Sequence, residues 1–121
     1  SMFERARPVI FGAFLGAVAQ GDLDGLQRLL SSDVVAWSDG GGRAKAARNL
    51  VYGPDRVARL FVGIARKGGN DGEAAFETLN GWPGVVLRRG GVAVAAMTIE
   101  TDGEAIFALH VITNPDKLAR V

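Results

Sequence analysis

The chain has 121 residues, of which 48% are hydrophobic, and its 14 Lys and Arg against 13 Asp and Glu leave a formal net charge of +1. This size and balance are typical of one globular domain that buries about two-thirds of the surface its unfolded chain exposes. Because the chain has no cysteine, disulfides and thiolate metal sites are excluded. The small net charge gives no reason to expect broad contact with a nucleic-acid backbone, so we expect no direct DNA binding.

The ends of the chain carry no membrane or export pattern. No apolar run approaches the roughly 20 residues that cross a bilayer, and the first residues lack the regions of a signal peptide. We therefore expect a cytosolic protein with no membrane contact. Ser1 and Met2 look like a cloning scar, because a native start puts Met first. Residues 3–121 are then expected to form a single domain.

Two helices are predicted before any strand. Apolar residues at three- and four-residue spacing predict an amphipathic helix over Pro8 to Gln20, with Pro8 in its first turn. Gly21-Asp22 breaks this pattern. The leucines over 23–30 then predict a second, shorter helix, with Asp22 as its N-cap.

A short hairpin and a third helix are predicted next. Val34 to Ser38 is β-prone and ends at a turn cluster, and Arg43 to Val51 can return antiparallel to it. A third helix enters through Gly53-Pro54-Asp55 and stops at Gly68-Gly69. Its apolar face is expected to hold Val57, Leu60, Phe61 and Ile64.

The second half of the chain changes to a period of two. Four successive strands are predicted, joined by short turns of the kind that connect antiparallel neighbours: 73–80, 85–89, 92–101 and 104–113. The last two are apolar on nearly both faces, so both faces need cover. Helices followed by one curved antiparallel sheet make an α+β fold, and a sheet curled into a cone over the helices satisfies this need.

The motifs of the chain resemble one family. The order of elements, with the strings over 21–26 (Gly-Asp-Leu-Asp-Gly-Leu) and 29–34 (Leu-Leu-Ser-Ser-Asp-Val), resembles the SnoaL-like branch of the nuclear-transport-factor-2-like superfamily. Two further strings, 37–43 (Trp-Ser-Asp-Gly-Gly-Gly-Arg) and 114–118 (Asn-Pro-Asp-Lys-Leu), resemble signatures of the C-terminal SnoaL-like extension on a group of extracytoplasmic-function sigma factors. The family usually has Lys where this chain has Arg43, and Arg presents its donors differently. The resemblance extends from the first helix to Leu118.

This resemblance implies a cone-shaped α+β fold with N-terminal helices packed on a curved antiparallel sheet around a pocket. It also implies a regulatory domain that modulates transcription initiation by contacting sigma domains two and four of the same polypeptide, and through them RNA polymerase. The chain itself contains no helix-turn-helix pattern. The implied contact residues are Asp39, Gly40, Gly41, Gly42, Arg43, Asn114, Pro115, Asp116, Lys117 and Leu118.

Both contact motifs also have plain structural explanations. Asp followed by glycines is typical of a hairpin turn, although three consecutive glycines cost more backbone entropy than a stable turn requires. Asn114 followed by Pro115 and Asp116 is typical of a capped helical turn. Neither explanation excludes a partner surface.

A pocket inside the cone is the second candidate site. Its expected lining is Trp37, Phe61, Phe76, Asn80, Trp82, Met97 and His110, with Asn80 as the polar contact for a small apolar ligand. Most of these residues are equally explained as core. Asn80 and Trp82 also fit a turn with Gly81 and Pro83, and His110 shares a predicted strand face with Ile106, Ala108 and Ile112, opposite Phe107, Leu109 and Val111.

The sequence contains no compact set of residues that could carry catalysis. Asp39 and His110 are the candidate acid and base, but Asp39 lies beside glycines, which is a poor setting for a positioned base. One His and scattered carboxylates form no metal ligand set, and we expect no metal, no cofactor and no enzyme activity. The alternative function is a stand-alone SnoaL-like small-molecule-binding protein, or an isomerase, cyclase or hydrolase. A homodimer formed through the sheet is a further candidate partnership.

Overall fold

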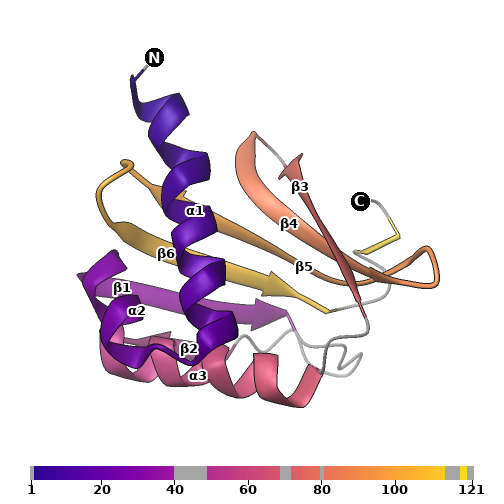
Figure 1. The fold of residues 1–121 in the computed structure, drawn as a ribbon, viewed down its shortest axis with the longest axis horizontal. Helices are drawn as coiled ribbons and strands as arrows, with labels where there is room; N and C mark the ends of the chain where they lie inside the picture. The colour runs from indigo at the N-terminus through magenta and orange to yellow at the C-terminus, as the bar shows by residue number, and fades with distance from the viewer. Residues whose placement is uncertain (1, 40–48, 69–71, 80, 114–117, 120–121) are drawn as a thin grey trace.

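The computed structural model describes residues 2–39, 49–68, 72–79, 81–113 and 118–119. Three helices and six strands follow one another in the order that the periodicity predicts (Figure 1). Their bounds are α1 Met2–Gln20, α2 Leu23–Leu29, β1 Leu30–Asp39, β2 Asn49–Tyr52, α3 Pro54–Gly68, β3 Glu73–Leu79, β4 Trp82–Arg89, β5 Val92–Thr101 and β6 Ile106–Ile112. The predicted α+β class is confirmed.

The six strands form one sheet in the order β2-β1-β6-β5-β4-β3. Strands β3 to β6 pair antiparallel with their chain neighbours, so the predicted meander is confirmed. The hairpin of β1 and β2 joins this meander through a parallel pairing of β1 with β6, which the sequence analysis does not predict. The helices cover one side of the sheet, and β3 and β4 bend out of the plane of the other strands (Figure 1).

Gly21 and Asp22 end one helix and begin the next, as predicted. Gly21 adopts a φ of 69°, which favours glycine, and the Asp22 N–H donates back to the Ala17 carbonyl at 2.9 Å. This is the bonding of a helix end closed by a glycine. The Asp22 side chain then accepts a hydrogen bond from the Gly25 N–H at 2.9 Å and caps α2.

Two predicted helix boundaries are wrong. Helix α1 begins at Met2, so Pro8 lies in its seventh position and not in its first turn. Proline is disfavoured there because it lacks the N–H that an interior helical residue donates. Leu30 belongs to β1 and not to the second helix, since its extended backbone ends α2 at Leu29.

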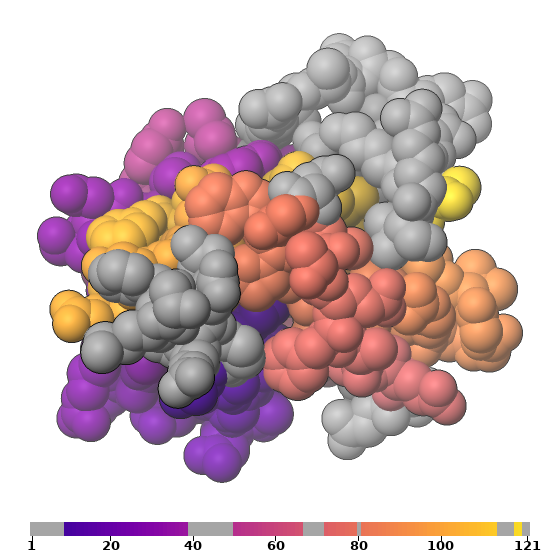
Figure 2. Space-filling view, turned by 90° about the horizontal axis from the view of Figure 1, so that it is seen from above, coloured from indigo at the N-terminus to yellow at the C-terminus, as the bar shows by residue number. Residues whose placement is uncertain are grey.

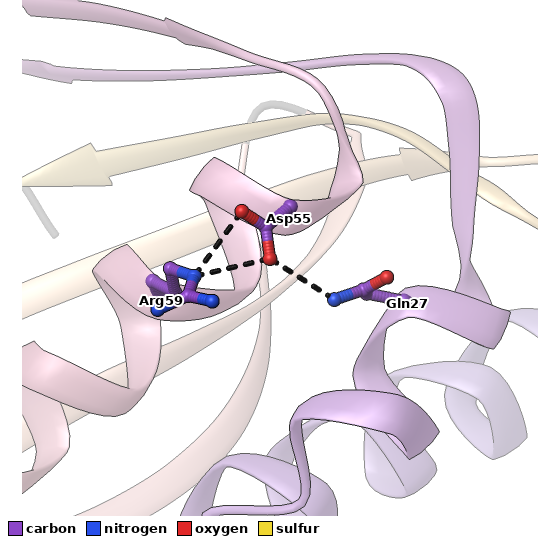
Figure 3. Close-up of polar contacts among 3 residues, drawn as sticks. All are labelled: Gln27, Asp55 and Arg59. Atoms are coloured by element: carbon purple, nitrogen blue, oxygen red, sulfur yellow. Dashed lines mark hydrogen bonds and ion pairs between the residues drawn. The ribbon is translucent and has the colours of Figure 1, made fainter.

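A polar contact joins the second and third helices. The Asp55 carboxylate, in the first turn of α3, accepts hydrogen bonds from the Gln27 side chain at 3.2 Å and from Arg59 Nε at 3.0 Å (Figure 3). The chain enters α3 through Gly53, whose φ of 92° is the turn conformation that the Gly-Pro-Asp string predicts. The Gly53 N–H also donates to the Val34 carbonyl at 2.9 Å, which ties this turn to β1.

Apolar side chains pack on both faces of the sheet. The helix face carries the larger core, in which Phe11, Phe14 and Phe61 of the helices meet Met97 and Ile99 of β5. The opposite face, called the outer face below, carries a small cluster of Val86, Ala96 and Leu118, with Leu79, Ala93 and Ile112 against it. Adjacent strand residues point to opposite faces, and the sequence prediction that both faces of β5 and β6 need cover agrees with these two clusters.

An extra residue in β6 changes one predicted face. Thr101 pairs with Ile106 and Glu100 pairs with Ala108, so Phe107 has no partner and bulges outward. Ile106 therefore packs in the core of the helix face with Leu109 and Val111. The prediction that Ile106 shares a face with Ala108, His110 and Ile112 is wrong because strict alternation fails at this bulge.

The turn between β5 and β6 is held by side-chain hydrogen bonds. The hydroxyl of the buried Thr101 donates to the Ala105 carbonyl at 2.5 Å and accepts from the Gly103 N–H at 3.0 Å. The Asp102 carboxylate accepts from the N–H groups of Glu104, at 2.8 Å, and Ala105, at 3.0 Å. These two bonds stabilise the charged form and lower the pKa of Asp102.

Replacing Gly16 with alanine is expected to raise the free energy of unfolding by about 1 kcal/mol, because alanine is the better residue inside a helix. Gly16 lies on the exposed side of α1, and a Cβ there meets no atom within 4 Å. Gly25→Ala is the matched control in α2, where the added Cβ collides with the carboxylate of the N-cap Asp22. Urea unfolding should show Gly16→Ala stabilised and Gly25→Ala destabilised. Equal shifts for the two variants would contradict this account.

Candidate functional site

Asp39 of the first predicted contact motif lies at the same end of the sheet as Ile112, two positions before the second motif. Strands β1 and β6 are parallel neighbours, and Asp39 pairs with Ile112. Asp39 is the last residue of β1 and Ile112 is the last residue of β6. We call this place the motif end. Of the predicted contact residues, the backbone of Asp39 and the whole of Leu118 are described. The other eight lie outside the described residues: Gly40, Gly41, Gly42, Arg43, Asn114, Pro115, Asp116 and Lys117.

Leu118 anchors the second motif to the outer face. Its backbone is helical and its side chain is only 5% exposed, packed against Val86 of β4 and Ala96 of β5. Burying a leucine side chain contributes about 1.5–3 kcal/mol. Leu118 therefore has a structural role in the packing of the outer face.

Two of the predicted pocket residues stack on each other away from the helices. Trp37 of β1 pairs with His110 of β6, and their rings lie 5.0 Å apart at 23°. Each follows a residue that packs in the core of the helix face: Ala36 precedes Trp37, and Leu109 precedes His110. Alternation thus places both rings on the outer face, and neither lines the cavity described below.

Two other predicted pocket residues, Phe76 and Trp82, also fall elsewhere. Phe76 is 62% exposed on β3, where its ring meets Phe11 of α1 edge-on at 5.8 Å, and Figure 2 shows β3 beside α1 on that side of the molecule. Trp82 was predicted in a turn, but it is the first residue of β4, paired with Leu79. Neither Phe76 nor Trp82 lines the cavity. Asn80 lies outside the described residues.

A cavity of about 230 Å³ lies between the helices and the sheet. The predicted pocket residues Phe61 and Met97 are part of its wall. The described wall consists of hydrocarbon side chains and one thioether: Phe14, Leu15, Val18, Phe61, Ile64, Ala65, Ala74, Val85, Leu87, Ala95, Ala96, Met97 and Val111. Sequence reasoning missed the α1 residues, although Phe14, Leu15 and Val18 share one helical face at spacings that could have identified them.

Charged groups of the described residues lie outside this cavity. Arg88 donates to Glu77 at 2.7 Å across β4 and β3, and this hydrogen bond raises the pKa of the Arg88 guanidinium. No group of three or more His, Asp or Glu side chains in the described part of the chain could hold a metal ion. The described cavity wall offers no acid, base or nucleophile, so its chemistry is that of apolar contact.

Sequence comparison finds one informative relative. No protein-family model matches the chain. It is 35% identical over 120 residues to the ECF RNA polymerase sigma factor SigJ of Mycobacterium tuberculosis, a match that covers 89% of this chain and 38% of the relative. The chain thus spans well under half the length of that relative.

Solved structures give the fold class. The crystal structure of the extracytoplasmic function sigma factor SigJ of M. tuberculosis matches with a TM-score of 0.72 and 28% identity, over 96% of this chain and 45% of that chain. An NTF-2 like protein of unknown function from Burkholderia xenovorans LB400 has a TM-score of 0.60 at 14% identity, over 94% of this chain and 87% of that one. A putative isomerase from Bacillus subtilis has a TM-score of 0.60 at 12% identity, over 92% and 88%. The last two likenesses show the fold alone.

The chain therefore has the nuclear-transport-factor-2-like fold, with helices packed on a curved sheet. More particularly, it is a homologue of part of the extracytoplasmic-function sigma factor SigJ, and the family resemblance predicted from its motifs is confirmed. Among the described residues, no helix combines the length and the apolar character needed to cross a bilayer.

Proposed function

We propose that this chain is a regulatory domain of an extracytoplasmic-function sigma factor that contacts sigma domains two and four through the motif end. The observation that supports this most is the parallel pairing of β1 with β6, because it places Asp39 of the first sigma-type motif beside Ile112, two positions before the second motif. Two motifs 71 positions apart in the chain would otherwise have no reason to share a surface. A single docking surface requires the two motifs to lie close together, and the pairing of Asp39 with Ile112 supports this.

The packing of Leu118 supports the same surface. Its burial against Val86 and Ala96 holds the last residue of the motif on the outer face. A docking segment that is held in place before it meets its partner loses less conformational freedom on binding. The motif at 114–118 would in this way combine a structural anchor with a contact surface.

The consequence for transcription would be a change in promoter opening by the sigma domains that this domain touches. RNA polymerase would be reached through those domains, and DNA would not be contacted by this domain itself. Such a protein acts in the cytoplasm and residues 3–121 act as one unit. No enzyme activity is part of this proposal, because the described cavity wall has no acid or base.

Calorimetric titration of the domain with a fragment carrying sigma domains two and four of the same polypeptide tests the proposal. Asp39→Ala and deletion of 114–118 are each expected to lower the affinity at least tenfold. Asp33→Ala is the matched control, since Asp33 is exposed and lies six positions earlier in the same strand. Transcription by the full-length factor should change with the deletion and stay unchanged with Asp33→Ala.

Two results would contradict the docking proposal. One is equal affinity for all four proteins. The other is unchanged transcription by a full-length factor that lacks 114–118 while its SnoaL-like domain stays folded. Size-exclusion chromatography in the same experiment measures self-association through the outer face, where Leu50 and Tyr52 are exposed, and a stable homodimer of the isolated domain would point to that competing use.

A second candidate function is the binding of a small molecule in the cavity. The specific observation that favours it is the open cavity of about 230 Å³ between α1, α3 and the sheet. This function is compatible with docking at the motif end, because the cavity lies on the helix face and Leu118 lies on the outer face. The isomerase, cyclase and hydrolase versions of this alternative have no described residue in the cavity to carry them.

A further inference from the structure

Strand β3 is the last strand of the sheet, and one of its edges has no partner strand among the described residues. It follows β4 in the order β2-β1-β6-β5-β4-β3 (Figure 1), and β4 pairs with it on one side only. The backbone N–H and C=O groups that point to the other side therefore bond to no described strand. Such an edge is a template on which one more strand can pair.

The strand lacks several features that usually prevent pairing at an edge. Many proteins protect an edge strand with lysine, proline, a bulge or a very short length. β3 has seven residues, contains neither Lys nor Pro, and pairs with β4 in one unbroken register, from Glu73 opposite Arg88 to Leu79 opposite Trp82. Its backbone is therefore regular over a length that an extended segment can follow.

The two faces of β3 differ in chemistry. Ala74 lines the cavity and Phe76 meets Phe11 of α1, so Ala74 and Phe76 point to the helix face. Alternation places Glu73 and Glu77 on the outer face. A segment laid along β3 would therefore meet apolar side chains on one face and two carboxylates on the other.

These side chains are accessible to a partner. Phe76 and Glu73 are exposed, and Glu77 is partly exposed although it accepts a hydrogen bond from Arg88 at 2.7 Å. Arg88 also lies opposite Glu73 in the register of β3 with β4. One arginine beside two glutamates leaves an excess of negative charge along this edge.

This charge decides between a second copy of the chain and a foreign strand. Two antiparallel β3 strands pair over all seven residues only when Phe76 lies opposite its own copy. No two glutamates are then directly opposite, but each Glu77 lies diagonal to both glutamates of the other copy, at the roughly 7–8 Å that long side chains can span. Four carboxylates would gather on one face, which disfavours self-pairing. A strand with cations at these positions gains attraction instead.

We propose that the free edge of β3 binds an extended segment of another protein with the pattern cation, apolar, any residue, apolar, cation. The cations would lie opposite Glu73 and Glu77, and the two apolar side chains would lie opposite Ala74 and Phe76. The pattern reads the same in both directions, so it suits a parallel or an antiparallel strand. This surface is additional to the motif end and does not depend on docking there.

The test is a nuclear magnetic resonance titration of the folded domain with three capped peptides. The first, Thr-Lys-Val-Thr-Val-Lys-Thr, carries the proposed pattern and should bind saturably, with its amide shifts concentrated at 73–79. The second replaces both lysines with glutamate and should bind at least tenfold more weakly, because like charges then lie opposite each other. The third replaces the central threonine with proline, which keeps the charge but breaks a strand, and it should also bind at least tenfold more weakly.

Hydrogen exchange distinguishes strand addition from attachment by charge alone. In an antiparallel edge strand, N–H groups alternate between those that bond to the neighbouring strand and those that point outward. The lysine peptide should therefore slow exchange at least tenfold at every second amide of 73–79. Attachment through the side chains alone would leave these outward amides exchanging at their original rate.

A pair of variants with the same change in charge locates the contact. Glu73→Lys should lower the affinity for the lysine peptide at least fivefold and raise the affinity for the glutamate peptide. Glu104→Lys makes the same change at an exposed position in the turn between β5 and β6, and it should change either affinity less than twofold. If Glu73→Lys does not fold, Glu73→Gln should show a smaller loss in the same direction, with Glu104→Gln as its control.

Four results would overturn the proposal. Equal binding of the lysine and glutamate peptides would contradict the charge pattern, and no saturable binding of the lysine peptide would contradict the surface itself. Binding without alternating protection in 73–79 would contradict strand addition. Protection of these amides that rises with protein concentration in the absence of peptide would show that a second copy occupies the edge. None of these results bears on docking at the motif end, which is tested with other variants.

Discussion

Truncating Phe14 to alanine is expected to lower the free energy of unfolding by about 3–5 kcal/mol, the range typical of large aromatic truncations in a core. Phe14 is 0% exposed, and its ring meets Phe61 edge-on at 5.4 Å. The void left by the ring would join the existing cavity, whose wall includes Phe14. A merged void cannot collapse easily, so we expect a value near the upper end of the range.

Urea unfolding monitored by circular dichroism measures this loss, and Phe76→Ala is the matched control. Phe76 has the same ring but is 62% exposed, so its truncation should cost about 1 kcal/mol, mainly from its edge contact with Phe11. If Phe14→Ala does not fold, Phe14→Leu should show a smaller loss in the same direction. A loss below about 1 kcal/mol for Phe14→Ala would show that the core is not built around this ring.

Replacing Leu118 with alanine is expected to lower the free energy of unfolding by about 2–3 kcal/mol, the lower part of the range for buried leucines. The lower part applies because the segment around Leu118 can detach without opening the core of the helix face. Hydrogen exchange should accelerate at 118–119 and stay slow at Ile99 and Leu109, which are fully buried on the other side of the sheet. The Leu118→Ala variant should also bind the fragment of sigma domains two and four more weakly than the wild type does.

Leu50→Ala is the matched control, because it shows how much stability is lost when a leucine outside the packed cluster is truncated. Leu50 lies in β2 and is 52% exposed, so the same truncation there should change stability by about 0.5 kcal/mol or less. Similar losses for the two variants would mean that Leu118 does not hold its segment on the sheet. In that case the second motif would have no fixed position relative to Asp39.

Local chemistry explains why the helices and the meander were predictable. Gly21 and Asp22 carry the end of one helix and the cap of the next in their own backbone and side-chain preferences, and the structure shows both bonds. The strands β3 to β6 follow one another with short turns, so their pairing requires only neighbouring segments. Each of these features is encoded within a few residues.

Pairing between segments far apart in the chain explains where the sequence predictions are wrong. No local sequence pattern indicates that β1 pairs in parallel with β6. None indicates that Phe107 is an extra residue in the pairing of β5 with β6. Alternation divides a strand into two faces but does not say which face the helices cover. Trp37 and His110 were for this reason assigned to the pocket with Phe61 and Met97, although only the latter pair faces the helices. The cavity was predictable as a consequence of the fold, and most of its lining was not.

The parallel pairing of β1 with β6 also has a consequence for how the chain folds. The first strand along the sequence and the last of the six are neighbours in the sheet, and Asp39 pairs with Ile112, 73 positions later in the chain. Contacts of such high sequence separation must wait until both segments have been synthesised, and they slow folding because a long loop has to be closed first. The hairpin of β1 and β2 and the meander of β3 to β5 can form early, but neither can bury its face alone. We therefore expect the rate of refolding to be limited by the arrival of β6 between them.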